Sequence, residues 1–303
     1  MSGRTRGTLV GLIAAVATAG LMAWAIVGVL GLAGRVDLPA TPPLARCEAV
    51  GTAYVVRPEQ AGNAATIVAV AVRRGLSPRA AEIALAAALQ ESKLVNLDFG
   101  DRDSLGLFQQ RPSQGWGTPT QVLQPRYAAG KFYDTLVRIP NWQRLPLTEV
   151  AQRVQQSGYP DAYARWEPEA IALVRALTGK VAAGLSCRFR PDDRPAELAD
   201  GSGLTARARA ALAAATTELG VRRTGMTGLA GAAEGRTFGL QPAGWFVASS
   251  LVAHAMELEI RQIGYAGRVW TPDTGWRPEA DPPAGPAKGT RTAPTDRIAV
   301  TVG

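Results

Sequence analysis

The chain has very few of the residues that bind metals or build nucleophilic triads. Its 303 residues include one histidine and two cysteines. A zinc site needs several Cys or His ligands at set spacings, and a serine hydrolase needs a Ser, a His and an Asp, so neither class is expected. A Gly-rich phosphate loop and an internal repeat are also missing. We therefore expect an activity that needs no metal and no cofactor.

Long blocks of one charge are missing as well. The net charge is +8, and the 33 Lys and Arg residues are spread along the chain. Because no RNA- or DNA-binding motif accompanies them, nucleic acid is not an expected partner. A dispersed basic surface suits the anionic polymers of a cell wall instead.

An uncharged segment over residues 8–33 is dominated by Leu, Val, Ala and Ile. At roughly 1.5 Å per residue, a helix of this length exceeds the ~30 Å hydrocarbon core of a bilayer. Arg4 and Arg6 precede it, which places residues 1–7 in the cytoplasm. We predict an uncleaved single-pass membrane anchor, followed by a stalk over 34–46. The alternative is a signal peptide with secretion after cleavage.

The two cysteines, Cys47 and Cys187, mark the ends of the next domain, predicted over residues 47–190. In an exported chain such a pair predicts a disulfide that ties the ends of the domain together. In the chain-entropy model a loop this long contributes about 4–5 kcal/mol. The alternative is two free, buried thiols.

A helix is predicted to begin at Ser77-Pro78, because Ser is a favoured N-cap and Pro a favoured first helical residue. Small residues share one face of it with Glu91, which lies at its C-terminal end. These small residues are Ala80, Ala84, Ala87 and Ala88. Glycosidic cleavage needs an acid that gives a proton to the leaving oxygen, and Glu91 is the candidate. Alternatively, Glu91 is a surface residue at a helix end.

Turn-forming residues follow over 96–104, with three carboxylates at Asp98, Asp101 and Asp103. Alternatives for this stretch are a solvated acidic loop and a calcium loop. Calcium is disfavoured, because an EF-hand loop needs a Glu at its twelfth position, and the twelfth residue counted from Asp98 is Gln109.

Three residues beyond this loop suit contact with a sugar. Gly106 has no Cβ and lets the backbone approach a sugar closely. Gln109 offers a donor and an acceptor to an N-acetyl amide. Trp116 lies between two glycines and suits stacking on a sugar ring, although a Trp that caps a core edge fits equally well.

Glu91-Ser92 and the segment Gly106-Leu107-Phe108-Gln109 together resemble lytic transglycosylases and goose-type lysozymes. In lytic transglycosylases the Gly and Gln follow the Glu at +15 and +18, as here. The turn Gly100-Asp101-Arg102 is similar to the goose-type turn, and the resemblance covers roughly residues 55–170. It implies a lysozyme-like helical fold, with Glu91 as general acid and Asp101 as a water-positioning or electrostatic group.

The resemblance also implies that Ser104, Gly106 and Gln109 contact substrate. A second goose-type Asp is replaced by Arg111. This departure disfavours hydrolysis with two carboxylates and favours attack by the sugar's own 6-hydroxyl, which gives a 1,6-anhydro product.

Lytic transglycosylases carry a Tyr late in the domain, in an Ala-Tyr-Asn-Ala-Gly segment. Tyr159 and Tyr163 lie in a comparable part of this chain, but neither reproduces the segment. We include both as candidate substrate contacts. A Tyr packed in the helical core is the alternative for each.

The remainder is predicted as a linker over 191–204 and a small α+β domain over 205–303. The only histidine, His254, lies beside an apolar stripe, which favours a core or boundary role. Further helices and strands are predicted from apolar periodicity. The helices span 125–137, 148–156, 168–183, 204–219 and 243–260; the strands span 262–271 and 297–302, with a loop over 272–295. The small domain resembles the C-terminal part of some actinobacterial envelope proteins, and this resemblance gives no particular activity for it. We expect a wall-binding or partner-binding role, with a purely structural role as the alternative.

The predicted fold class is mainly α: one transmembrane helix, a lysozyme-like helical catalytic domain and a small α+β domain. The predicted function is cleavage of peptidoglycan between N-acetylmuramic acid and N-acetylglucosamine by a membrane-anchored, extracytoplasmic glycosidase. The alternative is a non-catalytic peptidoglycan-binding or scaffold protein that keeps the same fold.

Overall fold

The computed structural model describes residues 45–157, 159–191, 205–219, 229–230, 243–279 and 297–302. The described residues belong to one compact unit. Helices and two small antiparallel sheets make this unit a mixed α and β structure. The predicted anchor over 8–33 lies outside the described residues, as do most of the stalk and linker. Among the residues described, no helix is long and apolar enough to cross a membrane.

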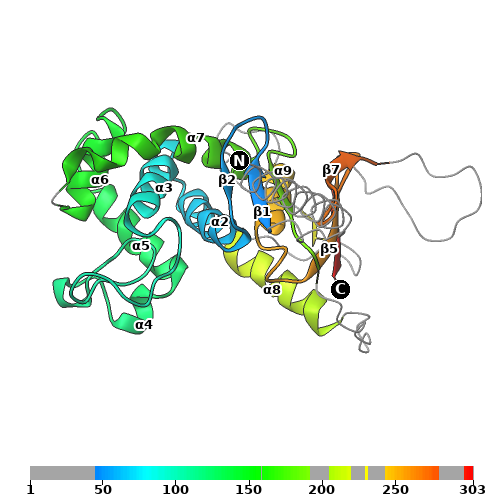
Figure 1. Cartoon of the computed structure of the whole chain (residues 1–303), viewed down its shortest axis with the longest axis horizontal. Helices are drawn as coiled ribbons and strands as arrows, with labels where there is room; N and C mark the ends of the chain where they lie inside the picture. Colours follow the sequence, from blue (N-terminus) through cyan, green and yellow to red (C-terminus); the bar gives the residue numbers. More distant parts are fainter. Residues whose placement is uncertain are drawn as a thin grey trace, which may run out of the picture. The chain divides into compact units, whose positions relative to one another are not determined.

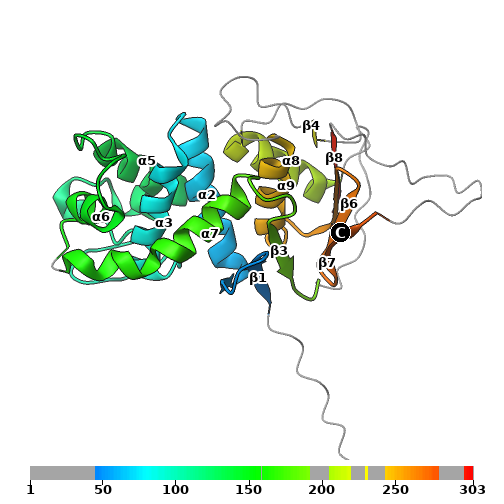
Figure 2. The ribbon, with the colours of Figure 1, turned by 90° about the horizontal axis from the view of Figure 1, so that it is seen from above.

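Two consecutive helices, α2 (Pro58–Arg73) and α3 (Pro78–Ser92), lie side by side (Figures 1 and 2). The predicted start at Pro78 is confirmed, although Ser77 makes no side-chain capping bond. The alanines of the predicted face are fully buried, and the opposite face of α3 is buried too. Its small side chains allow close packing, so α3 contacts α2, α5, α6 and α7.

Short helices complete this part of the unit. They are α4 (Pro119–Val122), α5 (Pro125–Leu136), α6 (Leu147–Gln155) and α7 (Glu167–Leu177), with 3₁₀ turns η1 (Pro112–Gln114) and η2 (Pro160–Trp166). The helices predicted over 125–137 and 148–156 are confirmed to within a residue. The helix predicted over 168–183 ends earlier, at Leu177. Gly179 follows with φ +75°, and a Cβ there would lie 2.8 Å from the backbone nitrogen of Phe246.

The first sheet brings together the start and the end of the chain segment 46–188. Its strands are β1 (Arg46–Ala49), β2 (Val55–Val56) and β3 (Leu185–Arg188), in the order β2-β1-β3. Cys47 lies opposite Cys187 in the antiparallel β1–β3 pair, and the two form a disulfide. The predicted bridge is confirmed.

The second sheet has the order β4-β8-β5-β6-β7. Its strands are β4 (Leu229–Ala230), β5 (Ile260–Tyr265), β6 (Arg268–Thr271), β7 (Gly275–Pro278) and β8 (Arg297–Val302), and it lies beside α8 (Ala206–Leu219) and α9 (Ala243–Ala253) (Figure 2). The strand predicted over 297–302 is confirmed, and so is the helix predicted over 204–219.

Three predictions in this region were wrong in detail. The helix predicted over 243–260 ends at Ala253, and β5 begins at Ile260. The strand predicted over 262–271 is a hairpin, because Ala266 and Gly267 both have positive φ, as the two-residue type I′ turn requires. The strand β7 occupies part of the predicted loop over 272–295.

The second sheet packs directly on the first. The indole Nε1 of Trp270 donates to the Cys187 carbonyl oxygen at 3.1 Å, and that of Trp276 donates to the Leu185 carbonyl oxygen at 2.8 Å. Trp245 of α9 packs edge-on against Trp276. One hydrophobic cluster therefore includes residues from both predicted domains. The boundary at 191–204 stays a prediction.

Candidate active site

Glu91 lies in the last turn of α3, and its half-buried side chain lines a cleft of about 800 Å³. The segment from Asp101 to Trp116 forms one wall. Residues of α5 and the end of α6 form the rest. Most side chains that line the cleft are polar or charged, which suits a hydrated ligand rich in hydroxyl and amide groups.

A buried tyrosine holds the Glu91 carboxyl group. The Tyr163 hydroxyl, on η2, donates to Glu91 Oε1 at 2.7 Å. Burial raises the pKa of Tyr163, and the nearby Glu91 charge adds to the effect, so the phenol keeps its proton and acts as donor. Tyr159 is 78% exposed and is not among the residues that line the cleft in the described part of the chain. Of the two predicted tyrosines, Tyr163 reaches the site as a partner of Glu91.

The serine after Glu91 joins the helix end to the downstream motif. Ser92 is buried, and its hydroxyl donates to the Leu107 carbonyl oxygen at 2.8 Å. From the other side, Gln155 of α6 donates through Nε2 to the Phe108 carbonyl oxygen at 2.8 Å. These bonds explain why a Glu-Ser pair occurs with a Gly-Leu-Phe-Gln segment: the serine places that segment beside the glutamate.

The motif segment itself is a tight hairpin. Leu105 and Gln110 exchange two backbone hydrogen bonds of 3.0 Å each. Gly106 has φ +76°, and a Cβ there would lie 2.7 Å from the Val122 carbonyl oxygen. Gly106 is buried and does not line the cleft within the described residues. Close packing against α4 therefore requires the glycine, and its contact with substrate stays a prediction.

Gln109 lines the cleft, with φ +48°. Its Nε2 lies 3.2 Å from the Gly106 carbonyl oxygen and 3.4 Å from that of Phe99. A Cβ on Gly100 would lie 2.0 Å from Gln109 Oε1 and 2.6 Å from the Ser104 carbonyl oxygen. Gly100 thus leaves room for the Gln109 side chain, which ties the acidic loop to the hairpin. Its contact with an N-acetyl amide stays a prediction.

In the acidic loop, Asp101 and Asp103 have different surroundings. Asp103 accepts hydrogen bonds from the Ser113 backbone at 2.7 Å, from Arg111 Nε at 2.9 Å and from the Ser113 hydroxyl at 3.0 Å. These bonds lower the pKa of Asp103 to about 2, the Ser113 backbone contributing most. Asp101 lines the cleft and has no ion pair within the described residues. Arg111, the departure from the goose-type pattern, thus pairs with a loop carboxylate.

Several predicted and unpredicted residues share the cleft. Ser104 and Trp116 line it as well, so the structure brings both together with Glu91, Asp101 and Gln109. The α5 wall was not predicted; it consists of Lys131, Asp134, Thr135 and Arg138. A polar stripe at helical spacing beside the inward-facing Phe132 and Leu136 was the available signal. Val137 follows the last residue of α5 and is 46% exposed.

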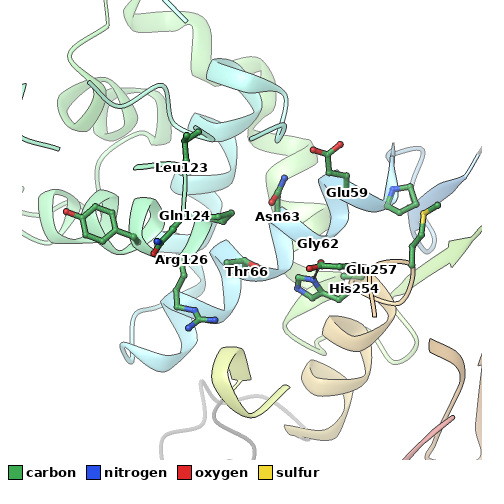
Figure 3. A pocket seen from close by; sticks show the side chains of 14 residues that line it. Glu59, Gly62, Asn63, Thr66, Leu123, Gln124, Arg126, His254 and Glu257 are labelled. Atoms are coloured by element: carbon green, nitrogen blue, oxygen red, sulfur yellow. Dashed lines mark hydrogen bonds and ion pairs between the residues drawn. The ribbon is translucent and has the colours of Figure 1, made fainter. Parts of the chain in front are cut away.

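A second cleft, of about 970 Å³, lies between α2, the start of α5 and the turn after α9 (Figure 3). His254 lines it, with Nδ1 3.3 Å from Glu257 Oε2. Gly62 of α2 faces the same ring, because a Cβ there would lie 3.2 Å from His254 Nδ1. The sequence predicted a core or boundary role for His254, and its partly buried ring packs against Gly62 of α2.

Within the described ranges, no three His, Cys, Asp or Glu side chains lie close enough to hold a metal ion. The chemistry available in the Glu91 cleft is proton transfer by a carboxyl group, together with hydrogen bonding from hydroxyl, amide and cationic groups. The resemblance to lytic transglycosylases and goose-type lysozymes stays a prediction from the sequence of Glu91, Ser92 and the hairpin. No protein-family model matches this chain, and no curated protein matches it.

Proposed function

We propose that the chain is a peptidoglycan glycosidase of lysozyme-like fold, with Glu91 as its general acid. The observation that carries the proposal is the Glu91 carboxyl group, held by the buried Tyr163 hydroxyl, at the wall of a polar cleft of about 800 Å³. Asp101, Ser104, Gln109 and Trp116 line the same cleft and supply the groups that a glycan needs.

The reaction needs one proton donor. Glu91 gives its proton to the oxygen that links N-acetylmuramic acid to N-acetylglucosamine as the C1–O bond breaks. The 6-hydroxyl of the muramic acid then attacks its own C1, and the Glu91 carboxylate accepts the hydroxyl proton. The products are a 1,6-anhydro-muramic end and a free 4-hydroxyl on the N-acetylglucosamine, and Glu91 is again protonated.

We favour this intramolecular route over hydrolysis. Hydrolysis by an inverting mechanism needs a second carboxylate to activate water. Asp103 is engaged by Arg111 and Ser113, and Asp134 forms an ion pair with Arg74. Besides Glu91, Asp101 is then the one cleft carboxylate that has no ion pair within the described residues. Arg111 stands where goose-type lysozymes have their second Asp, so water has a single candidate activator, and we give the 6-hydroxyl the greater weight.

The proposed location is the outer face of the cell membrane. Residues 8–33 serve as a single-pass anchor with residues 1–7 in the cytoplasm, so the cleft faces the cell wall. The Cys47–Cys187 disulfide supports this location, because disulfides persist in oxidising compartments.

Glu91→Gln is the direct test. The amide is nearly isosteric but has no proton to give, so release of muropeptides from purified peptidoglycan should fall at least ~10²-fold. Glu149→Gln is the matched control, because it removes only an exposed carboxylate paired with Arg153. Mass spectrometry of the released muropeptides is the measurement. Digestion by the Glu91→Gln variant at the parent rate would remove Glu91 as the acid.

Heavy-oxygen water identifies the product. Hydrolysis adds one labelled oxygen to each new reducing end, whereas the intramolecular route adds none. We expect unlabelled 1,6-anhydro ends. Labelled ends would assign hydrolysis and leave Glu91 as the acid. A parent protein that binds peptidoglycan and releases nothing would instead support the non-catalytic scaffold.

A further inference from the structure

The 3₁₀ turn η2 carries a second side chain, besides Tyr163, that reaches the end of α3. Trp166 is the last residue of η2 and follows Tyr163 by three positions. A 3₁₀ helix has three residues per turn, so side chains at i and i+3 lie on the same face. The Tyr163 hydroxyl donates to Glu91, and the Trp166 indole reaches the residue before it. Its Nε1 donates to Gln90 Oε1 at 2.8 Å.

Two cations contact the Trp166 ring. The Lys93 ammonium lies 4.3 Å from the ring centre and the Arg165 guanidinium carbon lies 4.8 Å from it, so both contacts are cation–π interactions. The Lys93 ammonium also donates to the Leu89 carbonyl oxygen at 3.0 Å, in the last turn of α3. Arg165 donates to Gln90 Oε1 at 3.0 Å. These contacts join η2 to the end of α3, and we call the four residues the α3–η2 clamp: Gln90, Lys93, Arg165 and Trp166.

The placement of η2 against α3 decides whether Tyr163 reaches Glu91. Their bond of 2.7 Å has the usual length for an O–H···O hydrogen bond, and such a bond weakens as its donor tilts away from the acceptor. The clamp joins the same two elements beside this bond, so it limits movement of η2 away from α3. A clamp that only stabilises the fold is the competing explanation, and a double-mutant cycle can separate the two.

We propose that Trp166 is a positioning residue for Glu91 and that it acts through Tyr163. The clamp fixes η2 at the end of α3, and the Tyr163 hydroxyl then stays on the Glu91 carboxyl group. Trp166 is not among the described residues that line the cleft, so its role is positioning and not contact with substrate. This inference rests on the proposed glycosidase function and adds to it the residues that orient the acid.

Trp166→Phe in the full-length protein removes the indole donor and keeps an aromatic ring for Lys93. We expect kcat for muropeptide release to fall by roughly 5-fold with little change in KM, because the acid loses its orientation while the cleft lining is unchanged. Trp276→Phe is the matched control, because that indole also donates at 2.8 Å, to the Leu185 carbonyl oxygen, and lies outside the described lining of the cleft. It should lower the melting temperature by a similar amount and keep the parent kcat.

A double-mutant cycle separates positioning from structural support. If Trp166 acts through the Tyr163 hydroxyl, Trp166→Phe should have no further effect on kcat once Tyr163→Phe is present. Independent roles would instead multiply the two losses. Gln90→Leu removes the acceptor and keeps the indole, so it should reproduce the kcat loss of Trp166→Phe. Multiplied losses, or the parent kcat in either Trp166→Phe or Gln90→Leu, would overturn the proposal.

The NMR signal of the Glu91 carboxyl carbon, in protein with ¹³C-labelled glutamate, gives a readout that does not depend on cleavage. Glu91→Gln assigns the signal, because it disappears in that variant. The signal should move in Trp166→Phe in the same direction as in Tyr163→Phe and keep its parent position in Trp276→Phe. This pattern in a parent protein that releases no muropeptides would remove the glycosidase and keep the positioning of Glu91. An unchanged signal in Trp166→Phe would overturn the positioning role, whether or not the parent cleaves peptidoglycan.

Discussion

Tyr163 and Glu91 are 72 positions apart in the chain, and their side chains meet in one hydrogen bond. The phenol is buried and keeps its proton, so it can only donate to Glu91 while it accepts from elsewhere. One carboxyl oxygen of Glu91 is thereby held against Tyr163, which limits the rotation of the carboxyl group. The sequence analysis included Tyr163 among candidate substrate contacts, and the hydrogen bond makes it a candidate positioning residue for Glu91, the proposed acid.

Tyr163→Phe should leave the fold intact and slow the reaction. The buried hydroxyl contributes about 1 kcal/mol to stability. We expect kcat to fall by roughly 10-fold with little change in KM, because orientation of the acid is lost while the cleft keeps its substrate contacts. Tyr159→Phe is the control, since that side chain is exposed and away from the cleft. An equal loss of kcat in both variants would contradict a positioning role for Tyr163.

The Asp103–Arg111 pair predicts a pH effect on the loop. The pKa of Asp103 is lowered to about 2, against an unfolded value of about 3.9. Its contribution to stability is therefore complete above pH ~4 and is lost as pH falls toward 2. Asp103→Asn lacks this contribution at every pH, so the difference in melting temperature between parent and variant should be present at pH 6 and vanish near pH 2. A difference that persists unchanged at pH 2 would contradict the assignment.

At the scale of elements, the acidic loop and the hairpin are held together by close backbone packing around Gly100 and Gly106. Gly100→Ala should displace the Gln109 side chain, because the new Cβ would lie 2.0 Å from its Oε1. We expect a loss of about 1–3 kcal/mol in stability, typical of overpacking, and reduced cleavage. Chemical denaturation and muropeptide release measure the two effects.

Gly130→Ala is the matched control for that substitution. Gly130 lies within α5, and nothing outside its own helix would meet a Cβ there within 4 Å. Replacing a helical glycine by alanine in open space should stabilise the protein by roughly 0.5–1 kcal/mol. Destabilisation of equal size in both variants would show that the loop packing around Gly100 has no special role.

The elements that could be predicted are those with local signals. Pro78 and Pro125 begin α3 and α5, and apolar periodicity defines their lengths. The short strands β1, β2, β3, β4 and β7 were missed, because each has only two to four residues, too few to show alternation. The α5 wall was missed because residue spacing can indicate a polar face on a helix but cannot indicate what that face lies next to. Only the tertiary structure shows that it lines the same cleft as Glu91.

At the scale of the whole molecule, the second sheet closes over the first. The carbonyl oxygens of Leu185 and Cys187 accept from Trp276 and Trp270, and both strand residues are buried. The predicted catalytic domain therefore has an apolar surface that the C-terminal segment covers. The sequence analysis predicted two separate domains and did not predict this shared core. The tryptophans that contribute to it lie some 90 residues after the strand β3 that they contact, and composition gives no sign of so distant a contact.

Truncation after residue 190 should therefore damage the catalytic segment. It removes the donors to two buried carbonyl oxygens and exposes the cluster around Phe189, so we expect a lower melting temperature and aggregation. Size-exclusion chromatography and thermal melting of residues 45–190 and 45–303 measure this. A fragment that stays monomeric and melts at the temperature of the longer protein would show that the second sheet is dispensable.

The pairing of β1 with β3 also governs the order in which the chain can fold. Cys47 and Cys187 are 140 positions apart, yet their strands are neighbours. Contacts of such high sequence separation form late, because the loop between them must first be ordered. A chain that emerges from its N-terminus exposes β1 long before β3 is available, while α2 to α7 can already pack. We therefore expect β1–β3 pairing and thiol oxidation to follow the packing of α2 to α7, so that the disulfide stabilises the completed fold and does not direct its formation.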